Sequence, residues 1–159
     1  MPLILTDTTV LNNFAQVKRP ELLRQAFSEL AALEVVRKEL AAGERLGRVP
    51  VCDWSWLQLV ALTEAERARA VDLERHLQAG EAACLAVAES RGGLIVTDDS
   101  SARRLAVSLR LETSGTLGAL VRLVRREIIT LAQGDELLSE MITRGYRSPL
   151  RSLRETAVW

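Results

Sequence analysis

The chain has 159 residues, a hydrophobic fraction of 48% and a formal net charge of zero, which favour one globular domain over a disordered or fibrous protein. No apolar run approaches the roughly 18 residues of a membrane-spanning helix, and the N-terminus lacks a signal-peptide pattern. We therefore expect a cytoplasmic protein with no membrane partner. Residues 1–159 are expected to form a single domain, with a core over about 3–145 and a C-terminal tail over 146–159.

The charges are divided unevenly along the chain. Residues 1–99 contain 15 acidic and 11 basic side chains, whereas residues 100–159 contain 6 acidic side chains and 10 arginines. This division suits an acidic pocket with arginines that attract a polyanion, but it also suits ordinary arginine-rich helix surfaces. The two cysteines, Cys52 and Cys84, lie among apolar neighbours without a metal-binding spacing and are expected to be packed thiols.

The first half of the chain alternates between short apolar runs and amphipathic stretches. Thr63 and Glu66 have the spacing of a capping box, and Gly43 is a plausible helix C-cap. Leu30, Leu33, Val36 and Leu40 repeat at helical spacing. The expected elements are strands over 2–6 and 56–62, and helices over 8–17, 20–27, 29–47 and 63–77.

The second half continues the alternation. An alanine-rich helix over 80–93 ends in two glycines and is followed by a strand over 94–98. A helix over 100–109, a strand over 110–114 and helices over 116–128 and 134–146 complete the pattern, while 147–159 is not assigned. Alternating strands and helices with continuous apolar strands predict a three-layer α/β fold with a mainly parallel sheet flanked by helices.

Acidic residues follow two of the expected strands. Asp7 comes directly after "LILT", and Asp98 and Asp99 come after "LIVT". Each could simply cap the helix that follows it, although one cap needs only one aspartate. Because the carboxyl ends of parallel strands share one edge of a sheet, we expect all three carboxylates to meet there.

Glu81 belongs to the same edge if its helix starts there, although a carboxylate at that position also complements the helix dipole. Crowded carboxylates repel one another unless a counter-charge is present, and Mg²⁺ or Mn²⁺ would supply it. Such an ion activates water for phosphodiester hydrolysis. The only histidine, His76, lies on the charged helix and is expected at the surface.

Other chemistries have little support in the sequence. There is no combination of serine, histidine and aspartate or of cysteine and histidine that would suggest a nucleophile, and there is no GxxxxGK[ST] loop. Of the chemistries considered, hydrolysis by an activated water is the one that the sequence still supports.

Four segments together resemble a known family: "LTDTTVLNNF", "VVRKELAAG", "GEAACLAVA" and "LIVTDDSSARRLA", with "TSGTLGALVRLVRREII" downstream. The chain resembles the PIN-domain ribonucleases, and most clearly the short prokaryotic PIN-like proteins related to VapC-type toxins. The resemblance covers about residues 3–145. One departure is that the family usually has a strand with a proline before the second acid, whereas "AALEVVRKEL" is predicted to be continuous helix.

The resemblance implies a metal-dependent endoribonuclease with Asp7, Glu39, Glu81 and Asp99 as catalytic acids. It implies a Mg²⁺ or Mn²⁺ site in which Asp98 is a neighbouring or substitute ligand. Thr6, Thr8 and Thr97 would then orient carboxylates or water, although helix capping and strand packing explain them equally well. Without the resemblance, Glu39 would be a solvated surface acid.

The expected partners follow from the same interpretation. Arg103 or Arg104 would hold a phosphate of an RNA substrate, unless they are only helix-surface residues. An antitoxin protein and a homodimer are further expectations. Trp54 and Trp56 belong either to the core, which we favour, or to an interface. The alternative function is a catalytically inactive PIN-like domain that binds nucleic acid or a partner.

Overall fold

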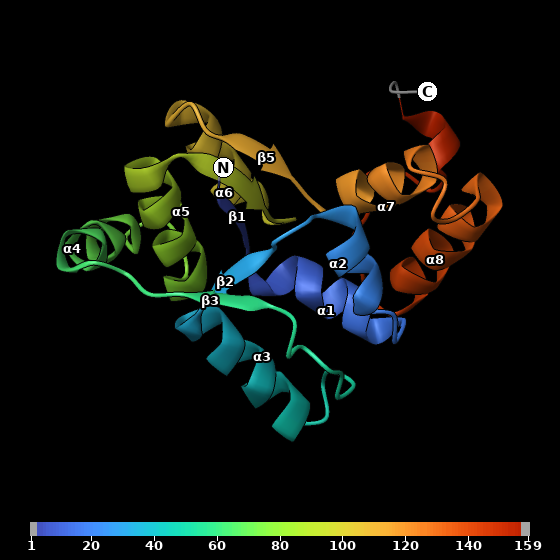
Figure 1. Ribbon diagram of the computed structural model, residues 1–159, viewed down its shortest axis with the longest axis horizontal. Helices are drawn as coiled ribbons and strands as arrows, with labels where there is room; N and C mark the ends of the chain where they lie inside the picture. Colours follow the sequence, from blue (N-terminus) through green and yellow to red (C-terminus); the bar gives the residue numbers. More distant parts are fainter. Residues whose placement is uncertain (1–2, 157–159) are drawn as a thin grey trace.

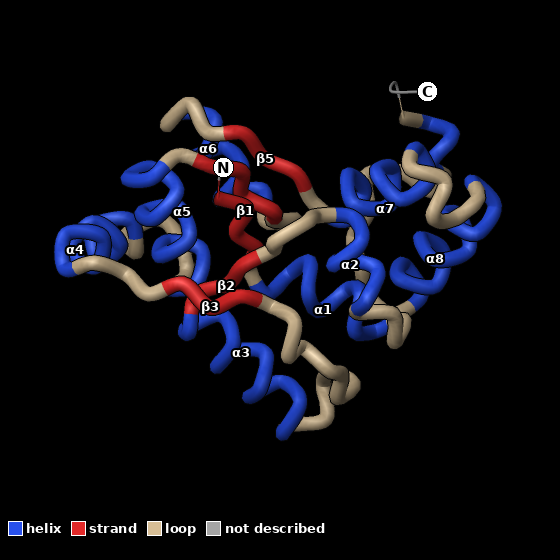
Figure 2. The backbone as a smooth tube through the Cα atoms, viewed as in Figure 1, coloured by secondary structure: helices blue, strands red, loops and turns tan. Residues whose placement is uncertain are grey.

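Five parallel strands form one central sheet within residues 3–156, the part of the chain that the computed structural model describes. They are β1 (Leu3–Thr6), β2 (Ala31–Leu33), β3 (Gln58–Val60), β4 (Gly93–Val96) and β5 (Glu112–Ser114). The strand order is β3-β2-β1-β4-β5, and every neighbouring pair is parallel. Figure 2 shows the strands in red among the blue helices. This arrangement confirms the expected α/β fold.

Eight α-helices and a short 3-10 helix accompany the sheet within the same residues. Figure 1 shows α4 and α5 together at one end of the molecule and α2, α7 and α8 at the other, with the strands between them. The helices are α1 (Thr8–Gln16), α2 (Glu21–Ala26), α3 (Glu34–Arg45), α4 (Glu64–Leu73), α5 (Ala79–Arg91), α6 (Ser100–Ser108), α7 (Thr116–Arg125), α8 (Leu131–Thr143) and η1 (Leu153–Glu155).

Helix α5 is buried along most of its length. Its alanines and the adjacent Cys84 allow close packing, and the helix contacts β1, β2 and β4. Gly92, which ends the helix, has a positive φ of 75°, as the two-glycine signal predicts. Cys84 and Cys52 are free thiols; Cys84 is buried and Cys52 half-buried.

The expected helix over 29–47 is wrong in its first part. Residues Ala31–Leu33 form β2, which pairs with both β1 and β3, and α3 begins only at Glu34. A short strand that is buried on both faces is continuously apolar, so its leucines fit a helical spacing by coincidence. Gly43 lies inside α3, which ends at Arg45, so the expected C-cap is also wrong.

The expected strand over 56–62 shortens to β3 at the edge of the sheet. Just before it, Trp54 is only 5% exposed and belongs to the core, which confirms the favoured interpretation. Trp56 is half-buried, and its ring centroid lies 5.8 Å from that of Trp54.

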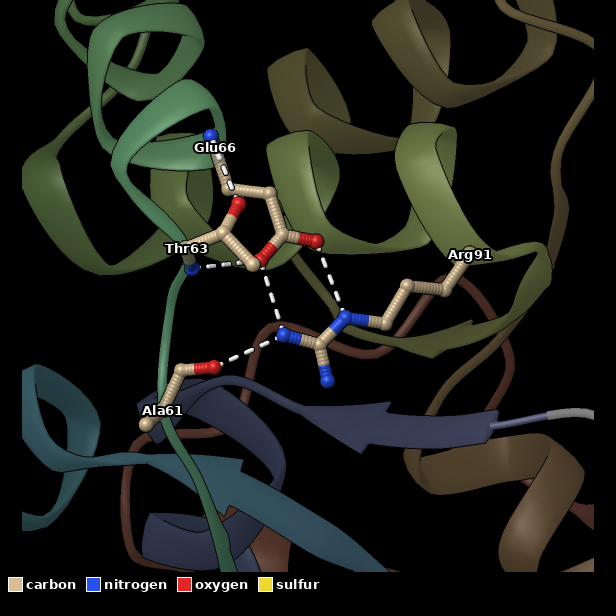
Figure 3. Close-up of polar contacts among 4 residues, drawn as sticks. All are labelled: Ala61, Thr63, Glu66 and Arg91. Atoms are coloured by element: carbon tan, nitrogen blue, oxygen red, sulfur yellow. Dashed lines mark hydrogen bonds and ion pairs between the residues drawn. The ribbon is translucent and has the colours of Figure 1, made fainter.

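An ion pair fastens α4 to the end of α5 (Figure 3). The Arg91 guanidinium donates from Nε to Glu66 Oε2 at 2.9 Å and from Nη2 to Glu66 Oε1 at 2.7 Å. The same Nη2 donates to the Ala61 carbonyl at 2.7 Å. Glu66 also completes the predicted capping box, because the Thr63 N–H donates to Glu66 Oε1 at 2.7 Å.

The C-terminal segment packs against α8. Leu153 is fully buried, and its N–H donates to Asp135 Oδ1 at 2.7 Å. Residues 1–2 and 157–159, which include the end of the expected tail, lie outside the described residues. No helix within residues 3–156 has the length and apolar character to cross a membrane.

Candidate active site

Asp7 and Thr97 lie side by side where β1 and β4 end. The register pairs Thr6 with Val96, and the Asp7 N–H donates to the Val96 carbonyl at 3.1 Å. Asp7 is 2% exposed and accepts hydrogen bonds from the Thr9 N–H at 3.0 Å and the Thr9 hydroxyl at 2.6 Å. Asp7 therefore caps α1, as one interpretation of the sequence expected, and also lies at the strand edge.

Two threonine hydroxyls connect Asp7 to the Asp98–Asp99 pair. The Thr9 hydroxyl donates to Asp7 Oδ1 and accepts from the Asp98 N–H at 3.0 Å. The Thr97 hydroxyl donates to Asp7 Oδ2 and accepts from the Asp99 N–H at 3.1 Å. Oδ1 of Asp7 is therefore held by Thr9 on α1, and Oδ2 is held by Thr97 at the end of β4.

The adjacent aspartates have different surroundings. Asp98 accepts from the Asn13 side-chain amide at 3.0 Å and from both the N–H and the hydroxyl of Thr116. Asp99 caps α6 through a bond of 2.8 Å from the Ala102 N–H to its Oδ2. Asp98 thus joins the ends of β4 and β5 to α1, whereas Asp99 lines a hollow together with Glu81.

The two arginines of α6 also differ. Arg103 is half-buried and donates from Nη1 to the Thr97 carbonyl at 3.0 Å. Arg104 is exposed, and its Nη2 lies 3.4 Å from the Ser101 hydroxyl. The first supports the strand edge, and the second remains accessible to a ligand.

Glu81 and Glu39 reach the same edge from two other helices. Glu81 lies in the first turn of α5, and the Gln78 N–H donates to its Oε2 at 3.3 Å. Glu39 lies on α3, and its Oε2 accepts from the Thr8 hydroxyl at 2.7 Å. A Cβ atom at Gly80 would lie 2.9 Å from Glu39 Oε1, so this glycine leaves room for the carboxylate.

Burial and neighbouring carboxylates raise the pKa values of Asp7 and Glu81. Burial raises the pKa of Asp7 to about 6, and the charge of Asp98 adds to this. Burial, followed by the charges of Asp99, Asp7 and Glu39, raises the pKa of Glu81 to about 7. These shifts indicate that five acids from separate helices and strand ends share one electrostatic site.

The three threonines expected around the site all form hydrogen bonds there. Thr8 and Thr97 donate to the carboxylates of Glu39 and Asp7. Thr6 donates instead to the backbone carbonyl of Asp7, at 3.0 Å.

Sequence reasoning missed several neighbours of the acids, namely Thr9, Asn13, Thr116 and His76. Thr9 and Asn13 are four residues apart on α1 and therefore share a face, which was an available signal. Thr116 is fully buried at the start of α7, two residues after β5. His76 is exposed, as expected, but it lines a hollow together with Glu81 and Asp99.

The oxygen donors suit Mg²⁺ or Mn²⁺, because such ions prefer carboxylates and water. Within residues 3–156 no group of three or more His, Cys, Asp or Glu side chains forms a ready metal cage. Mg²⁺ usually binds through one or two carboxylates and keeps several waters, so a complete protein cage is not required. The donor chemistry therefore fits the ion.

Comparison with known proteins agrees with this arrangement. The family described as "PIN domain" matches residues 3–157 of the chain, while no curated protein sequence matches it significantly. PIN domains are generally nucleases and generally use divalent metals. The all-parallel sheet and the matched range lead to one conclusion: the chain belongs to the PIN-domain family.

Proposed function

We propose that this protein is a metal-dependent endoribonuclease in which Asp7, Glu39, Glu81 and Asp99 hold Mg²⁺ or Mn²⁺. One observation supports this most directly: four carboxylates meet at one edge, where burial and the charges of the other three raise the pKa of Glu81. None of the four forms an ion pair with lysine or arginine within residues 3–156. Such repulsion is costly unless a cation is bound.

Each side chain has a distinct task in this proposal. When bound, the metal ion lowers the pKa of a water and stabilises the negative charge that develops on the phosphate. Glu81 and Asp99 line the open side of the site, where a phosphodiester can reach them. Asp7 lies deepest, fixed by Thr9 and Thr97.

Asp98 serves as a positioning residue in this scheme and Asp99 as a ligand. The three hydrogen bonds to the Asp98 carboxylate occupy both of its oxygens. Asp99 has one hydrogen bond, to Oδ2, among the described residues. Mn²⁺ binding measured by electron paramagnetic resonance should therefore be lost in Asp99→Asn, while Asp98→Asn should lower stability and retain binding.

The family resemblance supports a more specific biological role as part of this proposal. The protein acts in the cytoplasm as the toxin of a toxin–antitoxin pair, is inhibited by an antitoxin and forms a homodimer. Leu59, on the edge strand β3, is 58% exposed. An exposed leucine at a sheet edge suits contact with a second subunit. Expression of the wild-type protein should stop bacterial growth, and Asp99→Asn should relieve the arrest.

Cleavage of single-stranded RNA tests the central activity. We expect hydrolysis with Mg²⁺ or Mn²⁺, none in a chelator and none in Asp99→Asn. Glu34→Gln is a matched control, because Glu34 is an exposed acid on α3 that pairs with Lys38. RNA binding without cleavage under any divalent metal would favour the inactive binding domain.

A further inference from the structure

A polar depression continues from the acidic site across the start of α6. One hollow of about 350 Å³ contains Glu81 and Asp99, and its wall includes His76 and Ser101. A second hollow of about 420 Å³ shares His76 and Ser101 and extends to Arg104 and Ser108. The two hollows therefore form one path that begins at the proposed metal ligands.

His76 lies where the two hollows meet. Its backbone N–H donates to the Leu73 carbonyl at 3.1 Å, in the turn that follows α4. Leu73 and Leu77, on either side of this turn, are 4% and 8% exposed and anchor it in the core. The imidazole therefore extends from a turn whose neighbouring leucines are buried, and it lines both hollows.

Arg104 lines the outer hollow. Its Nη2 lies 3.4 Å from the Ser101 hydroxyl, so the guanidinium is directed toward Ser101, which lines both hollows. Arg103 cannot take this role, since it donates to the Thr97 carbonyl. The path therefore contains an arginine and a histidine beside hydroxyl groups.

The charges along the path favour an anion at its outer part. The first turn of α6 borders both hollows through Ser101, and the partial positive charge of a helix N-terminus attracts anions. Arg104 adds a full positive charge there. Three carboxylates, Glu74, Glu81 and the α6 cap Asp99, line the inner hollow, so the anion should lie nearer to Arg104 than to these acids.

We propose that this path, which we call the phosphate track, binds the sugar–phosphate backbone of a single nucleic-acid strand next to the cleavage site. His76 and Arg104 donate hydrogen bonds to phosphates, and Ser101 and Ser108 contact the backbone. No Phe, Tyr or Trp lines either hollow among the described residues, so base stacking does not contribute here. The inference rests on the proposed nuclease function, because that function places a phosphodiester at Glu81 and Asp99.

Binding of a labelled oligonucleotide tests the track without cleavage. The probe is a fluorescein-labelled single-stranded RNA, with a DNA of the same sequence in parallel, measured by fluorescence anisotropy in EDTA. All proteins contain Asp7→Asn, so that no strand is cut. His76→Ala and Arg104→Ala should each weaken binding about threefold to tenfold.

The salt dependence gives a second readout. Because a phosphate contact releases counterions, Arg104→Ala should reduce the slope of log K against log salt by about 0.7 for a single strand. Arg75→Ala is the matched control: it removes a positive charge beside His76, but Arg75 lines neither hollow. We expect the control to bind almost as tightly as the parent protein, with an unchanged slope.

The outcomes separate this inference from the proposed function. Unchanged RNA and DNA binding in both His76→Ala and Arg104→Ala would overturn the phosphate track, even if the wild-type protein cleaves RNA. Equal losses in the Arg75→Ala control would also overturn it, since they would indicate only a diffuse positive field. If His76→Ala and Arg104→Ala weaken oligonucleotide binding, Arg75→Ala does not, and the wild-type protein cleaves no RNA, the phosphate track would be supported and the nuclease function rejected.

Discussion

Asp7 and Glu66 are equally buried, each with 2% exposure, yet their environments are opposite. Glu66 accepts two hydrogen bonds from Arg91, which lower its pKa to about 2 (Figure 3). Asp7 receives hydroxyl and amide hydrogen bonds but no cation, and burial raises its pKa to about 6. The chain thus neutralises one buried carboxylate internally and leaves the other without a counter-charge.

This difference separates a structural acid from a functional one. The Glu66–Arg91 pair connects two helices and satisfies the carboxylate within the protein. Asp7 lies beside other acids at the strand edge, where a bound cation would provide what Arg91 provides for Glu66. Perturbed pKa values of this kind cluster at functional sites.

Activity should show the largest contrast between the two acids. Asp7→Asn should reduce the rate of metal-dependent RNA cleavage by about 10²-fold or more, since it removes a carboxylate beside the reacting phosphate. Glu66→Gln should retain the wild-type rate at temperatures where it is folded. Single-turnover kinetics in Mn²⁺ measures the cleavage rates of both variants. Equal losses of rate in the two would show that Asp7 and Glu66 do not differ in function.

Stability, unlike activity, should depend strongly on the Glu66–Arg91 pair. Arg91→Ala leaves Glu66 buried without its partner and should lower the free energy of unfolding by about 2–3 kcal/mol. The matched control is Arg69→Ala, which breaks the exposed pair with Glu89 and should cost less than about 1 kcal/mol. Urea denaturation compares the two, and a similar small loss in both would show that the buried pair contributes little.

The pH dependence of stability should sharpen the comparison further. The folded pKa of Asp7, about 6, lies above the ordinary value of 3.8, so the folded state favours protonated Asp7. Its stabilising effect is complete below pH 3.8 and is lost as the pH rises through 6. Without metal, this group should cost about 1–2 kcal/mol between pH 5 and 7.5.

Asp7→Asn should remove this part of the pH dependence in EDTA. Glu66 changes little over the same range, because its stabilisation is already complete above its ordinary pKa of 4.5. A pH profile that is identical in wild type and Asp7→Asn would contradict the raised pKa.

The smallest expected effect comes from Gly80. A methyl group there would lie 2.9 Å from Glu39 Oε1 and would displace the carboxylate. Gly80→Ala should lower kcat by at most about tenfold, because a small displacement misplaces one ligand. Its thermal stability should be retained, because alanine favours helix. A wild-type kcat would indicate that Glu39 adjusts or has no role.

Several features of the candidate site were predictable from sequence. Strand ends followed by Asp7 and by Asp98 and Asp99 place carboxylates at one edge of a parallel sheet, and the structure brings them there. The different environments of Asp98 and Asp99 were not predictable. They depend on Asn13 and Thr116, which are distant in sequence and meet Asp98 only in the folded chain.

The strand at Ala31–Leu33 shows a similar limit. Local periodicity favours helix there, but pairing with β1 and β3 on both sides outweighs it. The same applies to His76, whose sequence neighbours suggest only a charged surface. Its position beside Glu81 and Asp99 depends on the packing of α4 against α5.

The sequence by itself determined the alternation of strands and helices, the parallel sheet and the edge at which most of its acids gather. These features arise from local periodicity, capping and the chain order of the strands. The tertiary structure decided which acid received a cation from the protein and which did not. That choice depends on long-range contacts such as Glu66 with Arg91 and Asp7 with Thr97, because hydrogen bonds and burial set a carboxylate's pKa only after distant segments meet.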